Sequence, residues 1–496
     1  MKPIPPLLVL GPTLSAILVV LGAISGSVET TYLGPAVING FLACYTGWRF
    51  TKGNDGPANL LFYAGTFLFY HFQLLMPDYW ADFSQAIVGY SSESRFMSAL
   101  GTSLLPMACL GVARLLERGW PVNEPAGTIR GDEAVVFNDR RVFAGFLGLF
   151  ALVAVPNVLF GGVVESSVNS ILYMRGLDEG RDGIVISDRL ASILNINHFA
   201  CSLVTLTWVL YRTKYWRVAL LLLPLSGMWA LGSIFGMGTR TQVLQFGLAL
   251  LVPLFGRTSL KNRLFTVVVL GATMFVIVQI MTYYRTVGLK EVQLDEFADA
   301  IGGIQGLETM HDQTRAVEMY VEGYVSPEAT GVAPLDLVIG LLYRPIELLM
   351  FPLPRSFFPW KPVDPTGLDL SRWAISRMGI DPDRFLWGIT GGLLGRDTLR
   401  WGALGALVAV FWFTVICWFA DREFRRDRRS MTQLIVSGAF AGTAISMYRD
   451  LSPLWCLQLL PAAIVLIYAR VGLRGRSVVA PSVIADRLTT VRGGSA

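Results

Sequence analysis

Residues 6–24 read PLLVLGPTLSAILVVLGAI, a run without a single charged side chain. A helix needs about 20 predominantly apolar residues to cross the hydrocarbon core of a bilayer, so this run has the length and composition of a membrane span. No small-residue cleavage site follows it, so we expect a retained helix and not a signal peptide. Comparable runs predict about twelve transmembrane helices, at residues 6–24, 31–49, 58–77, 97–114, 142–163, 191–211, 218–236, 241–256, 264–283, 399–420, 431–448 and 452–469.

The composition of the chain agrees with an all-α polytopic membrane protein. Hydrophobic residues make up 53% of it and charged residues only 16%, whereas soluble domains carry about a quarter charged residues. In a membrane protein the distribution of charge among the loops matters more than the net charge of +5, and we expect no nucleic-acid partner. All five cysteines fall inside predicted spans, which leaves a disulfide framework or a zinc site unsupported; they are Cys44, Cys109, Cys201, Cys417 and Cys456.

Lysine and arginine are distributed unevenly among the loops. They are concentrated after the second, fourth, sixth, eighth and tenth predicted spans and are sparse in the other short loops. Cytoplasmic loops carry the excess of positive charge in membrane proteins, so both termini are expected in the cytoplasm. The predicted organisation is helices one to nine in 1–283, a large outer loop in 284–398, helices ten to twelve in 399–470 and a cytoplasmic tail in 471–496.

The large outer loop is expected to be partly helical. Its apolar stretch 335–352 contains Arg344 and Glu347 and is followed closely by prolines. Charged side chains are costly inside a bilayer. This stretch is therefore predicted to be a surface-lying or re-entrant helix.

Positive side chains also occur at the outer ends of predicted spans, where positive charge is normally sparse. Any one of them could be an arginine that reaches back to the interface. Together they would converge if their helices surround one outward-open cavity. Arginine binds phosphate oxygens through a planar fork of donors, so such a cavity suits a polyprenyl pyrophosphate whose tail lies in lipid. The candidate substrate-binding residues are Arg240, Tyr284, Arg285, Arg344, Arg355, Lys361, Tyr448 and Arg449.

The candidate general base lies in the outer-loop segment GLETMHDQTRAVEMYVEG. Its apolar residues recur at roughly helical spacing and predict an amphipathic helix on the outer surface. Glu308, His311 and Arg315 share one face of that helix. Because the pKa of histidine lies near neutrality, His311 is the favoured proton acceptor, with Glu308 as the other catalytic candidate. The alternative is a solvated helix face.

Other candidates have structural alternatives. His71 is expected to pack at the interface and His198 to make a structural hydrogen bond. Trp360, Trp373 and Trp387 could stack on sugar rings or could belong to the aromatic belt of the interface.

Four short motifs within residues 236–450 resemble the O-antigen polymerase (Wzy-type) family, which comprises oligosaccharide repeat-unit polymerases of the GT-C type. The motifs are GMGTR, YYR, LPRSFFPWKP and YRD, ending at Arg240, Arg285, Pro362 and Asp450. The resemblance implies a GT-C-like glycosyltransferase of the bacterial inner membrane. Its donor and acceptor would both be glycans linked to undecaprenyl pyrophosphate, with membrane lipids around it and a chain-length regulator as a candidate partner.

The resemblance also implies how the leaving group is stabilised. Arginines would bind the pyrophosphate in place of a metal, so no metal or other cofactor is expected. The residues that match the family's contacting arginines are Arg240, Arg285, Arg355 and Arg449, with Lys361 and Arg344 as weaker candidates.

Two other classes of function remain open. A transporter or lipid flippase would share the number of spans, but WRFTKGNDGPAN (48–59) lacks the Asp-Arg element of the major facilitators, and the large loop is external. An O-antigen ligase would use the same donor lipid with lipid A core as the acceptor. Its arginine and loop-histidine design is similar, so sequence alone separates it poorly from a polymerase.

Overall fold

The computed structural model describes residues 4–53, 55–120, 309–324, 326, 328–350, 366–377, 391–426 and 431–449, with isolated positions between 217 and 273. In these residues the chain is helical or in turns, with no strand. Three of the described helices are long and apolar enough to cross a membrane: α1 (Leu7–Ser25), α5 (Ser92–Gly119) and α18 (Gly405–Arg426). The described chain therefore has the character of an α-helical membrane protein, while twelve spans and a GT-C-like fold stay predictions.

The first two helices form a tight hairpin. α1 ends where Gly26 adopts a φ of 71°, a left-handed conformation that costs glycine little. α2 (Val28–Thr51) begins at once, because the side chain of Ser27 accepts a hydrogen bond from the backbone N–H of Thr30 at 3.1 Å. The two helices then pack along each other, close to the predicted spans 6–24 and 31–49.

The predicted span 58–77 is helical but not uniformly wound. A short α3 (Pro57–Leu60) continues into two π-helical segments, η1 (Leu61–Gly65) and η2 (Phe67–His71), and a 3₁₀ turn, η3 (Gln73–Leu75). The next helix, α4 (Pro77–Val88), lies outside the predicted spans. It starts at a proline, which suits the first helical position. α5 follows after a short turn, capped by the Ser91 side chain on the backbone N–H of Ser94.

The described part of the large loop is helical, as expected. It contains α14 (Thr309–Val321), α15 (Ala333–Met350), α16 (Thr366–Arg377) and α17 (Gly392–Trp401). α14 lies within the predicted amphipathic segment 306–323, and α15 covers residues 335–350 of the predicted 335–352 helix, whereas α16 lies in a stretch with no predicted helix. The predicted span 399–420 begins too early: a corner at Gly402, with a φ of 72°, separates α17 from α18.

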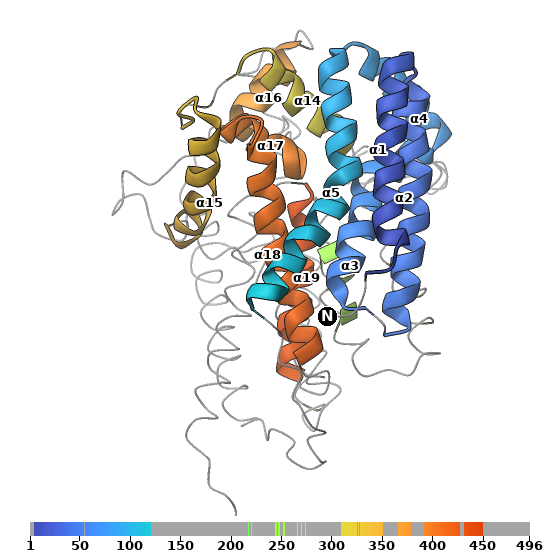
Figure 1. The fold of residues 1–496 in the computed structure, drawn as a ribbon, viewed down its shortest axis with the longest axis vertical. Helices are drawn as coiled ribbons and strands as arrows, with labels where there is room; N and C mark the ends of the chain where they lie inside the picture. Colours follow the sequence, from blue (N-terminus) through green and yellow to red (C-terminus); the bar gives the residue numbers. More distant parts are fainter. Residues whose placement is uncertain are drawn as a thin grey trace, which may run out of the picture.

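Within the described residues, the helices enclose a larger and a smaller hydrophobic core. The larger core joins residues from α1, α2, η1, α5, α18 and α19 (Met431–Met447). The smaller core lies between α14, α16 and α17 and contains Ala316, Met319, Leu370, Ala374 and Leu399. We call α14, α16 and α17 the cap. Figure 1 shows α14 and α16 together at the end of the bundle where α4 meets α5, and α17 packs against α14, α15, α16 and α18.

Candidate functional site

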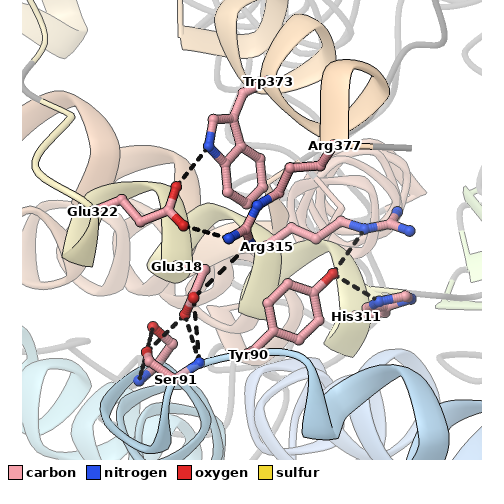
Figure 2. A network of polar contacts seen from close by, with 9 residues as sticks. Tyr90, Ser91, His311, Arg315, Glu318, Glu322, Trp373 and Arg377 are labelled. Atoms are coloured by element: carbon pink, nitrogen blue, oxygen red, sulfur yellow. Dashed lines mark hydrogen bonds and ion pairs between the residues drawn. The ribbon is translucent and has the colours of Figure 1, made fainter. Parts of the chain in front are cut away.

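Two consecutive residues between α4 and α5 hold α14 in place. The hydroxyl of Tyr90 lies 3.0 Å from Nε2 of His311. The next residue, Ser91, donates both its backbone N–H and its hydroxyl to the carboxylate of Glu318, the hydroxyl at 2.7 Å. Figure 2 shows both contacts. Because His311 and Glu318 lie two turns apart on one face of α14, this pair of contacts fixes the helix along its axis and in rotation.

His311 stands among aromatic rings and beside a cation. Its ring meets Phe83 and Tyr90 edge to face, with centroids 6.3 and 5.7 Å away. Arg315, one turn further along α14, donates from Nε to the Tyr90 hydroxyl at 3.4 Å and from its terminal nitrogen to Asp312 at 3.2 Å. Burial first, and then the positive charge of Arg315, lower the pKa of His311 from 6.5 to about 3. His311 is therefore neutral at physiological pH.

Glu318 is charged despite being 4% exposed. Burial alone would raise its pKa, but hydrogen bonds from Ser94 and Ser91 and the charge of Arg377 outweigh burial and lower the pKa below 4.5. The carboxylate also lies at the first turn of α5, where the helix dipole favours negative charge.

Glu322, directly after α14, connects this helix to α16. Nε1 of Trp373 donates to Glu322 at 2.9 Å, Arg377 donates to the same carboxylate at 2.5 Å, and the guanidinium lies 4.9 Å from the centre of a Trp373 ring (Figure 2). Trp373, a candidate for sugar stacking, thus already contacts a guanidinium within the protein.

Arg344 lies in a buried ionic network, not in an open cavity. Its guanidinium is hydrogen-bonded to Glu347 at 2.7 Å and to Asp397, and Arg344 and Asp397 are 4% and 0% exposed. Arg400 links the same Glu347, at 3.1 Å, to Glu328. The charge of Arg344 is neutralised inside the protein, and in this arrangement the residue holds α15 against α17.

Tyr448 and Arg449 follow directly after α19. Tyr448 is fully buried, and its hydroxyl bonds to the backbone of Leu61 at 2.6 Å, so its side chain belongs to the core. Its carbonyl accepts the N–H of Leu393 at 3.0 Å, which fastens this turn to the start of α17. Arg449 is half-buried and makes no ion pair within the described residues.

The start of α17 also touches α14. A Cβ atom on Gly392 would lie 3.1 Å from Cβ of Gln313, so the two backbones approach closely. Gln313 lies two residues from both His311 and Arg315, so it projects from the side of α14 opposite to them. The turn that carries Arg449 and the helix that carries His311 therefore lie against the same end of a ten-residue helix, which is about 15 Å long.

The other predicted site residues lie outside the described residues: Glu308, Arg240, Tyr284, Arg285, Arg355 and Lys361. The same holds for His198, Trp360 and Trp387. His71 is buried and lies 3.2 Å from the amide nitrogen of Asn39. Among the described residues, no group of histidine, cysteine and carboxylate side chains is arranged to hold a metal.

Sequence reasoning missed the partners that organise this site. Tyr90 and Ser91 carry a weak signal, since GYSSES before an apolar run is typical of a helix start. Glu318 and Asp397 carry none, because their partners are distant in sequence. Comparisons of the chain with protein-family models, with curated proteins and with solved structures gave no match.

Proposed function

We propose that this protein polymerises oligosaccharide repeat units linked to undecaprenyl pyrophosphate, as a metal-independent glycosyltransferase at the outer face of the bacterial inner membrane. In this reaction the bond from the anomeric carbon to a pyrophosphate oxygen breaks with its electron pair going to the pyrophosphate. A hydroxyl oxygen of the acceptor glycan forms the new bond and loses its proton to a base. The protein must therefore bind a diphosphate and accept a proton at one place.

One observation carries this proposal: α17 brings together the turn of Arg449 and the helix of His311. Leu393 holds the carbonyl of Tyr448, and Gly392 contacts Gln313. Arg449 matches an arginine of the resembled family and His311 is the candidate base, and the segments that carry them, far apart in sequence, thus reach one end of the bundle. A polar helix above a lipid-embedded bundle suits a substrate with a lipid tail and a polar glycan.

Several arginines of the cap and of α15 are already paired with carboxylates. Arg315 and Arg377 face carboxylates of the cap, and Arg344 faces Glu347 and Asp397. A pyrophosphate needs further positive charge, which the proposal assigns to Arg449 and to residues predicted from the sequence: Arg240, Arg285, Arg355 and Lys361.

The test is a reaction with the purified full-length chain and a synthetic repeat unit on undecaprenyl pyrophosphate, with chelator present. The expected result is a ladder of longer lipid-linked glycans. Activity that disappears with chelator, transfer to lipid A core alone, or movement of the substrate across vesicles without covalent change would each reject the proposal in favour of a metal enzyme, a ligase or a flippase.

Variants locate the activity within the chain. Arg285→Ala and Arg355→Ala are expected to abolish the ladder, and Arg449→Ala to lower the rate at least tenfold while Arg449→Lys retains part of it. The matched control is Arg118→Ala, an exposed arginine in the last turn of α5, which should leave the rate unchanged. Full activity in Arg285→Ala and Arg355→Ala would reject these site assignments.

A further inference from the structure

The hydroxyl of Tyr90 lies between two side chains of α14. Nε of Arg315 donates to it at 3.4 Å, and its oxygen lies 3.0 Å from Nε2 of His311. A guanidinium has donors only, so it cannot accept the hydroxyl proton. Within the described residues, Nε2 of His311 is the acceptor that remains for this proton. The arrangement therefore favours the tautomer in which Nε2 accepts and Nδ1 carries the hydrogen.

We infer that His311 serves as a hydrogen-bond donor, through Nδ1–H, to a phosphate oxygen of a prenyl pyrophosphate, and not as the proton acceptor of the reaction. This inference rests on the proposed function and specifies the contact that His311 makes. In the part of the chain that the structure describes, Nδ1 has no hydrogen-bond partner. Figure 2 shows the His311 ring and the Arg315 guanidinium on the same side of Tyr90, so the donor lies beside a guanidinium, which is itself paired with Asp312 at 3.2 Å.

The same surroundings make His311 a poor base. A general base works best when its pKa lies near the operating pH, whereas burial and Arg315 lower the pKa of His311 to about 3. A neutral imidazole can still polarise an oxygen by donating a hydrogen bond. Burial among Phe83, Tyr90 and the backbone of α14 thus suits the donor role and opposes the acceptor role.

The proton of the acceptor hydroxyl must then go elsewhere. Glu308, which directly precedes α14 in the sequence, is the other catalytic candidate and takes that proton. The pyrophosphate leaves with the electron pair of the broken bond, and His311 donates to one of its oxygens. The atoms and charges of the transfer balance with these two residues in separate roles.

Two substitutions separate donor from acceptor. In His311→Asn the side-chain amide nitrogen takes the place of Nδ1 and still donates, but it cannot take up a proton. In His311→Ala both abilities are lost. If His311 is a donor, His311→Asn should retain the laddering rate within about tenfold and His311→Ala should lose about a hundredfold or more, the cost of removing one donor to developing charge. Equal loss in both variants overturns the inference.

A binding measurement separates this inference from the proposed function. The full-length chain in detergent micelles is titrated with undecaprenyl pyrophosphate, and folding is checked by gel filtration and thermal unfolding. If the natural sequence makes no ladder, the proposed function fails, yet the donor role still predicts tighter binding by His311→Asn than by His311→Ala. Equal affinity of the two variants for the probe contradicts the donor role.

The tautomer can be observed directly in the unsubstituted protein. The chain has three histidines, so ¹⁵N-histidine labelling gives few signals, and the His311→Asn spectrum identifies the one from His311. The expected spectrum shows a protonated Nδ1 and an unprotonated Nε2, and Tyr90→Phe should shift it. Protonation at Nε2 in the natural sequence overturns the inference even if the asparagine variant does not fold.

Discussion

Ser91 and Glu318 are 227 residues apart in the sequence, yet Glu318 accepts hydrogen bonds from both the backbone N–H and the hydroxyl of Ser91. This contact joins the N-terminal helices to the large loop. Glu318 is 4% exposed and Ser91 is half-buried, so the contact lies largely away from bulk water.

Removal of this carboxylate should destabilise the protein. Glu318→Ala removes the carboxylate that accepts from the N–H and the hydroxyl of half-buried Ser91, and we expect a loss of about 1–3 kcal/mol in the free energy of unfolding. The matched control is Glu322→Ala, whose side chain is 39% exposed and pairs with Arg377, with an expected loss of about 0–1 kcal/mol. Thermal unfolding of the two variants measures the difference, and equal losses would contradict the assignment of Glu318.

The buried ionic network gives a prediction about Arg344. Arg344→Leu leaves the carboxylate of Asp397, which is 0% exposed, without its cation, and the expected cost is about 3–5 kcal/mol. The double variant Arg344→Leu/Asp397→Leu removes both charges and should recover a large part of that loss. A double-mutant cycle by thermal unfolding measures the coupling. If the loss in the double variant equals the sum of the losses in Arg344→Leu and Asp397→Leu, the pair is not coupled as described.

The corner between α17 and α18 depends on a glycine. A Cβ atom on Gly405 would lie 1.8 Å from the carbonyl oxygen of Asp397, whereas a Cβ on Gly111 in α5 meets nothing within 4 Å. Gly405→Ala should therefore destabilise the protein by about 1–3 kcal/mol through overpacking. Gly111→Ala, the matched control, should stabilise it by about 0.5–1 kcal/mol through helix propensity. Similar melting temperatures for the two variants would contradict this corner.

Acidification should weaken the contacts of α14 with Tyr90 and Ser91. The folded pKa of His311 lies below its ordinary value of 6.5, so His311 is neutral in the fold. Below pH 6.5 the unfolded chain takes up a proton at His311 that the folded chain does not, and the free energy of unfolding falls. The folded pKa of Glu318 lies below 4.5, so its stabilising charge is present above 4.5 and is lost as the pH falls through that lower pKa. Both effects weaken the docking of α14 in acid.

Hydrogen exchange of α14 peptides, corrected for the intrinsic effect of pH, measures this release. Protection should decline as the pH falls from about 6.5 towards 3. His311→Asn cannot take up a proton, so its decline should begin only near the titration of Glu318. An unchanged profile in that variant would exclude His311 as the cause.

The positions of several helices follow from the sequence because they depend on local properties. The apolar run of α1 and the helical spacing of apolar residues in α14 are enough to predict both helices. The corner at Gly402 was missed although Arg400 lies two residues before it, because one glycine within an apolar run does not by itself mark the end of a helix. The partners of Glu318, Arg344 and Asp397 could not be predicted, since pairing between distant segments depends on tertiary packing and leaves no local pattern.

In the candidate site, too, local features could be predicted from the sequence and contacts between distant segments could not. The sequence placed His311 and Arg315 on one face of a helix, and the described structure has them in contact with one hydroxyl. It could not supply Tyr90, which provides that hydroxyl from another segment. Arg344 is a candidate as a cation in an outer-loop helix and Tyr448 as the neighbour of Arg449, whereas their burial depends on the packing of α15, α17 and α19.

α17 has a consequence for protein engineering. This ten-residue helix holds α14, α15, α16, α18 and the end of α19 at once. A chimera that exchanges α14 for a segment from another membrane protein must therefore transplant α14 to α17 as a single block and rebuild the junction with α18. It must also keep Phe83 and Tyr90, which contact His311 from outside that block.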